Sequence, residues 1–332
     1  MDIDFKKVNT LAIDADDSEP TIYYGPAIDP VMCGKPFSEM KLTFVLDTNL
    51  YSDICHKNTT LTFRHFLMLA ERYQIMIDPS FGVSEQIRVS EPTARTHLKH
   101  YRKHLNELFS IEIPSESQEQ LLASANNLCN GMKYNVRLLE NFLSIIKYIY
   151  RTKGDFEQKK SNYLKITSSV DLPQFGFILA CGYLFWKAKD RLENNNVIRK
   201  KIDAFMSVGK TVEKENKILH NAASDISLFH SCLDVFNLKY AGTQEFPILA
   251  TRDTVVGFLL KNLCFSHVFD NIDQKYKAGL FLRPSSPWYE DIKDDFYMFI
   301  SQASKPLSKG ALEQSDRLKN LEQLRAAYFA AS

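Results

Sequence analysis

Three short apolar runs in this chain each lead into an acidic residue, and this pattern constrains the fold more than any other. The runs cover residues 43–46, 75–77 and 247–250, and the acids that follow them are Asp47, Asp78 with Glu85, and Asp253. Each run is too short for a helix, so we expect strands that are buried on both faces. Because the carboxyl ends of parallel strands meet in one crevice, we expect acids at these ends to lie close together.

Outside these runs and outside residues 115–210, apolar residues recur at helical spacing. The expected helices cover residues 50–55, 60–73, 93–109, 212–236 and 254–262, and two further strands are expected over residues 111–113 and 265–269. Strands that alternate with helices are typical of a parallel, doubly wound sheet. The sequence therefore predicts an α/β fold.

Residues 115–210 depart from this pattern because they show helical spacing without a strand-like run. Helices are expected over residues 117–151, 173–191 and 197–208, and we interpret this stretch as an all-helical insertion with its own small core. The predicted organisation is an acidic leader over residues 1–40, a core in two parts over residues 41–114 and 211–283 that flank the insertion at 115–210, and a C-terminal segment over residues 284–332. That last segment is aromatic-rich and irregular, and it is expected to end in an amphipathic helix over residues 312–329.

Composition narrows the class of protein. A chain of 332 residues with 45% apolar residues can bury a large core, and its net charge of +1 argues against a protein that is basic throughout. The six cysteines include no C-x-x-C pair, which fits neither a zinc ribbon nor a disulfide framework and favours a reducing compartment. No apolar run approaches the roughly 18 residues of a membrane span, and the acidic amino terminus is unlike a signal peptide. We therefore expect a soluble, cytoplasmic protein that has no membrane partner.

A fourth acid, Asp225, belongs to the expected helix over residues 212–236. It is adjacent to an apolar stripe formed by Leu219, Ala222, Ile226 and Phe229. A carboxylate close to the buried side of a helix needs a partner or a metal ion. Several carboxylates in one place suit a hard divalent cation or the handling of a proton, whereas each acid alone also fits a helix cap or a solvated side chain.

The order of these motifs resembles the PIN domain family. The resemblance rests on Phe-Val-Leu-Asp47-Thr-Asn, a Glu after the second strand, Ser-Asp225-Ile-Ser-Leu on a helix and Ile-Leu-Ala-Thr-Arg-Asp253. It covers roughly residues 42–113 and 215–270, about the length of a compact domain. The family resemblance implies a three-layer α/β/α PIN-like parallel sheet, which the large all-helical insertion would interrupt.

The resemblance also implies an activity and a set of site residues. Members of the family are metal-dependent nucleases, many of which cut RNA, so an endoribonuclease that uses Mg²⁺ or Mn²⁺ is the implied function. The implied metal-binding acids are Asp47, Glu85, Asp225 and Asp253, and the implied supporting polar groups are Thr48, Asn49 and Thr251. Glu91 competes with Glu85 for the second position, and Glu85 is preferred because it follows its strand by a shorter path.

The most basic stretch of the chain lies on the expected helix over residues 93–109. Its candidate phosphate-binding residues are Arg95, Lys99, Arg102 and Lys103, and a solvated helix face is the simpler interpretation. A second basic cluster over residues 187–201 is interpreted as solvated surface. The expected partner is nucleic acid, with RNA favoured over DNA, and a protein inhibitor or a second copy of this chain are further candidate partners.

Two other functions fit the same residues. One is a non-catalytic PIN-like binding or scaffold module in which the acids serve only as structural caps. The other is a Mg²⁺-dependent phosphohydrolase of small substrates, for which a closed pocket rather than an open basic crevice would be expected.

Overall fold

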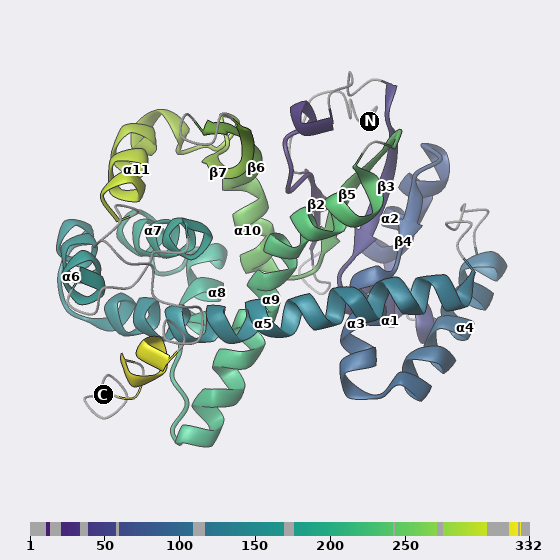
Figure 1. Cartoon of the computed structure of the whole chain (residues 1–332), viewed down its shortest axis with the longest axis horizontal. Helices are drawn as coiled ribbons and strands as arrows, with labels where there is room; N and C mark the ends of the chain where they lie inside the picture. Colours follow the sequence, from purple (N-terminus) through teal and green to yellow (C-terminus); the bar gives the residue numbers. More distant parts are fainter. Residues whose placement is uncertain are drawn as a thin grey trace. The chain divides into compact units, whose positions relative to one another are not determined.

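The computed structural model describes residues 11–13, 21–33, 39–57, 60–108, 117–168, 176–241, 243–270, 275–303, 319–324 and 326. The chain divides into two units (Figure 1). The strand unit comprises Met1–Lys133 and Leu228–Ser285, and the helical unit comprises Tyr134–Ser227 and Ser286–Ser332. Each unit is described by itself below.

The strand unit is built on a five-stranded sheet with the order β1-β2-β5-β3-β4. Its strands are β1 (Leu11–Ile13), β2 (Ile22–Gly25), β3 (Lys41–Leu46), β4 (Met76–Asp78) and β5 (Glu245–Thr251). The three strands predicted from the apolar runs are confirmed, and β3 runs parallel to both β4 and β5. The prediction of a wholly parallel sheet is wrong, because β2 pairs antiparallel with β5 and β1 pairs antiparallel with β2.

The register of the three parallel strands brings their carboxyl ends to one edge of the sheet. Val45 of β3 pairs with Asp78 of β4, and Leu46 of β3 pairs with Ala250 of β5. The residues that end or follow these strands, including Asp47 and Thr251, therefore reach the same edge. We call this the carboxyl edge.

Helices cover both faces of the sheet. They are α1 (Thr48–Cys55), α2 (Leu61–Arg72), α3 (Ser80–Val89), α4 (Glu91–Leu108) and α10 (Thr254–Asn262). One face, which includes Tyr24 and Phe44, packs into a core with residues of α1 to α4. On the other face α10 lies so close that a Cβ atom on Gly257 would come within 2.4 Å of the Tyr23 ring. The α/β prediction is thereby confirmed, as are the four expected helices that correspond to α1, α2, α4 and α10.

The last expected strand of this unit differs from expectation in its pairing. The strand expected over residues 265–269 exists as β6 (Leu263–Asp270), but it pairs antiparallel with β7 (Lys275–Leu282) in a separate two-stranded sheet. The strand expected over residues 111–113 lies outside the described residues. Helix α9 (Val212–Val235) continues into a π-helical turn, η3 (Phe236–Tyr240).

The helical unit contains α6 (Phe156–Ser168), α7 (Gly176–Arg191), α8 (Val197–Phe205) and α11 (Tyr289–Ala303), together with parts of α5 (Gln118–Arg151) and α9. The helices expected over residues 117–151, 173–191 and 197–208 are confirmed. The irregular structure expected after residue 284 is wrong, because α11 buries Ile292, Phe296, Phe299 and Ala303 at helical spacing. Of the helix expected over residues 312–329, residues 319–324 and 326 are described and are helical.

Across the described residues, no helix combines the length and the apolar character that a membrane crossing requires.

Candidate active site

Asp47 joins the ends of β3 and β5 at the carboxyl edge. The residue is 1% exposed, and its side chain caps α1, because Oδ1 accepts a 2.8 Å hydrogen bond from the backbone N–H of Leu50. Its Oδ2 accepts one hydrogen bond from the Thr251 hydroxyl at 2.7 Å and another from the backbone N–H of Arg252 at 3.1 Å. The predicted residues Asp47 and Thr251 are therefore in direct contact, although 204 positions separate them in the sequence.

The charge of Asp47 is difficult to maintain in this environment. Burial raises the pKa of the Asp47 carboxyl to about 6, although its hydrogen bonds from Leu50, Thr251 and Arg252 oppose the rise. The negative charge of Asp253 raises the pKa of Asp47 further, because the two carboxylates repel each other. Asp53, by contrast, is compensated by Arg252, whose Nη1 lies 2.5 Å from Asp53 Oδ2.

Asp253 follows β5 and repeats the local arrangement of Asp47. Its Oδ1 accepts a 2.7 Å hydrogen bond from the backbone N–H of Val256, so it caps α10. The backbone N–H of Asp253 donates to the Thr251 hydroxyl at 2.9 Å. One threonine hydroxyl thus connects two of the predicted acids.

Glu85 is brought to the same edge by its contact with Thr48. Its Oε2 accepts a 2.5 Å hydrogen bond from the Thr48 hydroxyl, and Thr48 is the neighbour of Asp47 in the sequence. The competing acid Glu91 is instead paired with Arg95 on α4 at 2.9 Å. Of these two acids, Glu85 is the one in contact with the predicted site, and the predicted supporting residue Asn49 is exposed on the first turn of α1.

The fourth predicted acid, Asp225, lies on α9 among residues of the helical unit. It is half-buried, and its sequence neighbours Ser224 and Ile226 are buried. In the part of the chain that the structure describes, no three His, Cys, Asp or Glu side chains are grouped as they would be around a metal ion.

Asp78, the last residue of β4, also lies at the carboxyl edge, but its contacts indicate a structural role. It is fully buried, and its carboxylate accepts hydrogen bonds from the Ser80 N–H at 2.8 Å, the Ser80 hydroxyl, the Lys239 ammonium at 3.2 Å and the Tyr240 hydroxyl at 2.6 Å. Burial alone would raise the pKa of Asp78, yet Lys239 and these hydrogen bonds together hold it below its ordinary value. Four accepted hydrogen bonds fill about all the acceptor positions of a carboxylate, which leaves none for a metal ion.

Arg252 is a site residue that sequence reasoning missed. Besides its ion pair with Asp53, it donates a 3.2 Å hydrogen bond to the Thr60 hydroxyl, and its guanidinium carbon lies 5.7 Å from the centre of the Phe63 ring. These contacts fix the loop after β5 against the ends of α1 and α2. The only sequence signal for this role is its position between Thr251 and Asp253.

The predicted basic surface on α4 is partly neutralised. Arg95 binds Glu91 and also Glu119, the latter at 2.6 Å, and Lys103 lies 3.8 Å from Glu107. Lys99 is exposed and Arg102 is half-buried. Of the four predicted phosphate-binding residues, Lys99 and Lys103 are the two that are exposed, and Lys103 has Glu107 nearby.

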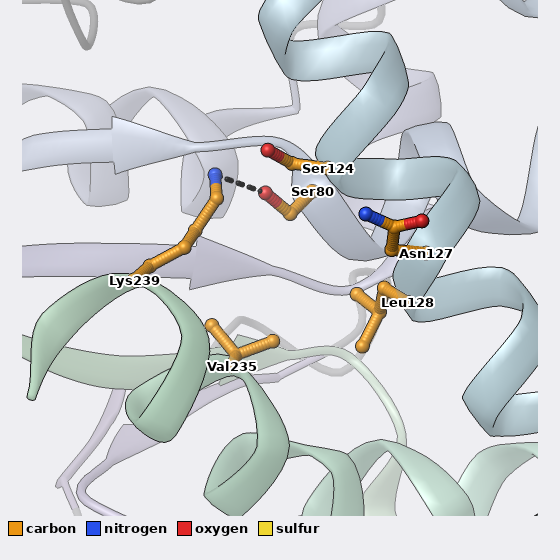
Figure 2. Close-up of a pocket in the computed structure, with 6 residues that line it drawn as sticks. All are labelled: Ser80, Ser124, Asn127, Leu128, Val235 and Lys239. Carbon is orange, nitrogen blue, oxygen red and sulfur yellow. Dashed lines mark hydrogen bonds between the residues drawn. The ribbon is translucent and has the colours of Figure 1, made fainter.

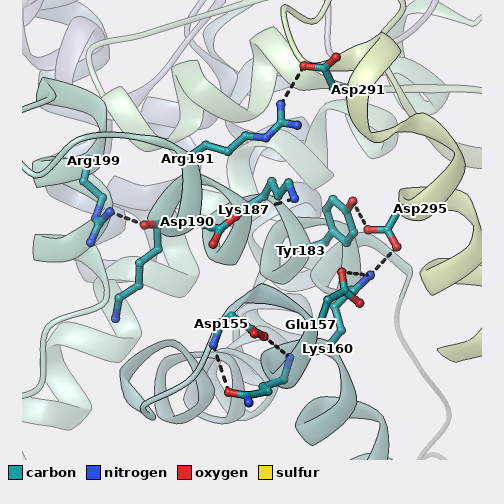
Figure 3. Close-up of polar contacts among 12 residues, drawn as sticks. Asp155, Glu157, Lys160, Tyr183, Lys187, Asp190, Arg191, Arg199, Asp291 and Asp295 are labelled. Atoms are coloured by element: carbon teal, nitrogen blue, oxygen red, sulfur yellow. Dashed lines mark hydrogen bonds and ion pairs between the residues drawn. The ribbon is translucent and has the colours of Figure 1, made fainter.

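Residues of the second basic cluster make contacts within the helical unit (Figure 3). Lys189 donates to the backbone carbonyl of Tyr150 near the end of α5, and Arg199 donates to the carbonyl of Leu192 just after α7. Arg191 pairs with Asp291 of α11 at 3.0 Å. The interpretation of this cluster as solvated surface is wrong for Lys189 and Arg199, because these cations satisfy the free carbonyls at helix ends.

We compared the chain with protein-family models, curated proteins and solved structures, and none of the three comparisons found a match.

Proposed function

We propose that this chain is a metal-dependent nuclease with a PIN-like fold, and that RNA is its favoured substrate. The observation that carries the proposal is that Asp47 and Asp253 follow two neighbouring parallel strands and that the Thr251 hydroxyl contacts both residues. The contact between Thr48 and Glu85 adds a third acid to the same edge. The order of the parallel strands and the helices on both faces of the sheet support the PIN-like part of the proposal.

The donor set fits a divalent cation. Mg²⁺ and Mn²⁺ prefer carboxylate oxygens, and a cation would relieve the mutual repulsion of Asp47 and Asp253. The three hydrogen bonds that Asp47 accepts leave about one of its acceptor positions for an ion. Asp47, Glu85 and Asp253, which all belong to the strand unit, would hold the ion, which would supply a nucleophilic water at neutral pH and neutralise charge on a phosphodiester.

The other residues of the proposed site orient these acids and guide the substrate. Thr251 fixes the Asp47 carboxylate, and Thr48 fixes Glu85, as outer hydrogen-bond partners commonly do for metal ligands. Lys99 is exposed on α4 and would attract the phosphates of a nucleic-acid strand.

A second candidate function is a non-catalytic PIN-like module. It is favoured by the observation that Asp47 and Asp253 each cap a helix, which is a sufficient structural reason for both residues. The absence of a three-residue metal group within the described ranges points the same way. The two functions differ in whether the chain binds a divalent cation and cleaves nucleic acid.

The test is cleavage of labelled single-stranded RNA and DNA in the presence of Mn²⁺, Mg²⁺ or EDTA. We expect the wild type to cleave RNA only with a divalent cation, and Asp47→Asn, Asp253→Asn and Glu85→Gln to fall to the level seen with EDTA. Glu91→Gln is the matched control, because Glu91 is the competing acid that pairs with Arg95 outside the site, and it should retain activity. Cleavage that survives in Asp47→Asn, or a wild type that cleaves neither strand, would contradict the nuclease proposal.

A further inference from the structure

A cavity of about 200 Å³ lies in the strand unit next to the buried end of β4 (Figure 2). Its wall is formed by Ser80, Ser124, Asn127, Leu128, Val235 and Lys239. These residues come from α3, α5, the end of α9 and the π-helical turn η3, and none of them is assigned to the proposed nuclease site. Single π-helical turns occur frequently at functional sites in proteins.

A fixed positive charge forms one side of this cavity. The Lys239 ammonium lies 2.8 Å from the Ser80 hydroxyl (Figure 2). It also lies 3.2 Å from Asp78 Oδ2, so neighbouring side chains fix its position and keep it charged. Ser80 is also the first residue of α3, and the start of a helix carries a partial positive charge. Because the Asp78 carboxylate offsets the charge of Lys239, this side of the cavity offers hydrogen-bond donors rather than a net positive charge.

Two polar side chains of α5 complete the wall. Ser124 and Asn127 are three residues apart on the helix, so they lie on the same face and both reach the cavity. Neither side chain is engaged in a hydrogen bond with the residues that the structure describes. A hydroxyl and an amide can each donate to a ligand oxygen.

Two other uses of the cavity are disfavoured by its contacts. A Ser–Lys nucleophile needs a neutral lysine as its base, but the carboxylate of Asp78 keeps Lys239 charged, so Ser80 is not activated. A metal cation would be repelled by the Lys239 ammonium. The combination of an ammonium group with hydroxyl and amide donors is instead suited to a ligand that carries oxygen acceptors.

We propose that this cavity, the Lys239 cavity, binds a small molecule through an oxyanion, either a phosphate or a carboxylate. Lys239, Ser124 and Asn127 supply hydrogen-bond donors to the oxyanion, and Leu128 and Val235 contact an apolar remainder of the ligand. The volume lies below the roughly 300 Å³ at which sites for drug-sized ligands begin, so the ligand is small. This proposal does not rest on the nuclease proposal.

The test is a calorimetric titration of the full chain with inorganic phosphate and, separately, with acetate. EDTA is present throughout, so that a divalent cation at the carboxyl edge cannot contribute. Asn127→Leu removes one donor and narrows the cavity, and both Asn127 and the control residue Asn126 are exposed on α5, which makes the fold tolerant of either change. Asn126→Leu is the matched control, because Asn126 precedes Asn127 and does not line the cavity.

We expect saturable binding of at least one probe by the wild type and by Asn126→Leu. Loss of one hydrogen bond to a charged ligand should make the binding of that probe by Asn127→Leu weaker by about tenfold or more. Tighter binding of phosphate would assign a phosphoryl ligand, and tighter binding of acetate a carboxylate ligand. A wild type that binds neither probe, or equal affinities in the two variants, would overturn the proposal, and neither result would bear on nucleic-acid cleavage.

Discussion

The hydroxyl of Thr251 donates a 2.7 Å hydrogen bond to Oδ2 of Asp47 and accepts a 2.9 Å hydrogen bond from the backbone N–H of Asp253. One side chain at the end of β5 therefore holds the residue that follows β3 and also shapes the turn into α10. This double role gives a physical reason for the spacing Thr-Arg-Asp after the strand. It also predicts that the arrangement of the two acids depends on a single hydroxyl.

Thr251→Val tests this dependence, because valine keeps the shape of the side chain and removes the hydroxyl. We expect the free energy of unfolding to fall by about 1–3 kcal/mol, the cost of a lost hydrogen bond to a buried charged group. Urea denaturation measures the change. Thr96→Val on the exposed face of α4 is the control and should have little effect. Equal stability of Thr251→Val and wild type would show that the hydroxyl does not hold Asp47.

The raised pKa of Asp47 predicts a particular dependence of stability on pH. The pKa is about 6 in the folded protein, whereas an unfolded aspartate has a pKa of about 4. Between these values the folded state keeps a proton that the unfolded state has lost. The contribution of Asp47 to stability is therefore greatest below about pH 4, and it is lost as the pH rises towards about 6, by about 1.4 kcal/mol per pH unit.

The measurement is the free energy of unfolding in EDTA at several pH values for wild type and for Asp47→Asn, which cannot titrate at this position. The wild type should lose stability relative to the variant between about pH 4 and about pH 6, and the difference should then level off. A difference that stays constant across this range would show that the pKa of Asp47 is not raised.

The sequence predicted the parts of the fold that depend on local pattern. Short apolar runs located β3 and β5, and the acids after them located the caps of α1 and α10. The sequence did not predict β2. Tyr23 and Tyr24 contact helices on opposite faces of the sheet, so this strand shows no alternation of apolar and polar residues. For α11, the buried residues from Ile292 onwards do recur at helical spacing, but the dense aromatic residues around them obscure this spacing in the sequence.

The candidate site was predictable in part for the same reason. Asp47, Thr251 and Asp253 follow strands that their own sequence identifies, whereas the role of Asp78 depends on Lys239 and Tyr240, which are 161 and 162 positions away. No local sequence pattern predicts such distant partners. The assignment of Asp78 to a buried ion pair therefore needed the structure.

The pair of Asp78 and Lys239 gives a second stability prediction. Lys239→Met should lower the free energy of unfolding by about 3–5 kcal/mol, because it leaves a buried carboxylate without its cation. The double variant Lys239→Met with Asp78→Asn should recover part of this loss, since it no longer buries an uncompensated charge. Urea denaturation of the two single variants and the double variant forms the cycle. Strictly additive effects would contradict a direct interaction between the two residues.

The helical unit contains a comparable pair, Lys147 and Glu215. Their side chains are 2% and 3% exposed, their charged atoms are 2.9 Å apart, and the second oxygen of Glu215 accepts a 2.6 Å hydrogen bond from the Gly209 N–H. Lys147→Met should therefore cost about 3–5 kcal/mol of stability. The exposed pair of Arg137 and Glu322 is the matched control, and Arg137→Met should have a much smaller effect in the same thermal or urea unfolding experiment. Similar losses in the two variants would mean that burial does not determine the strength of the Lys147 pair.

The central claim is that acids at the carboxyl edge bind a divalent cation, and Mn²⁺ binding measured by electron paramagnetic resonance tests it most directly. We predict that the full-length wild type and Glu91→Gln bind Mn²⁺, and that Asp47→Asn and Asp253→Asn, folded as the wild type is, bind it much more weakly. A folded wild type that binds no Mn²⁺, or Mn²⁺ binding that is the same in all four proteins, would contradict the account and favour the non-catalytic module.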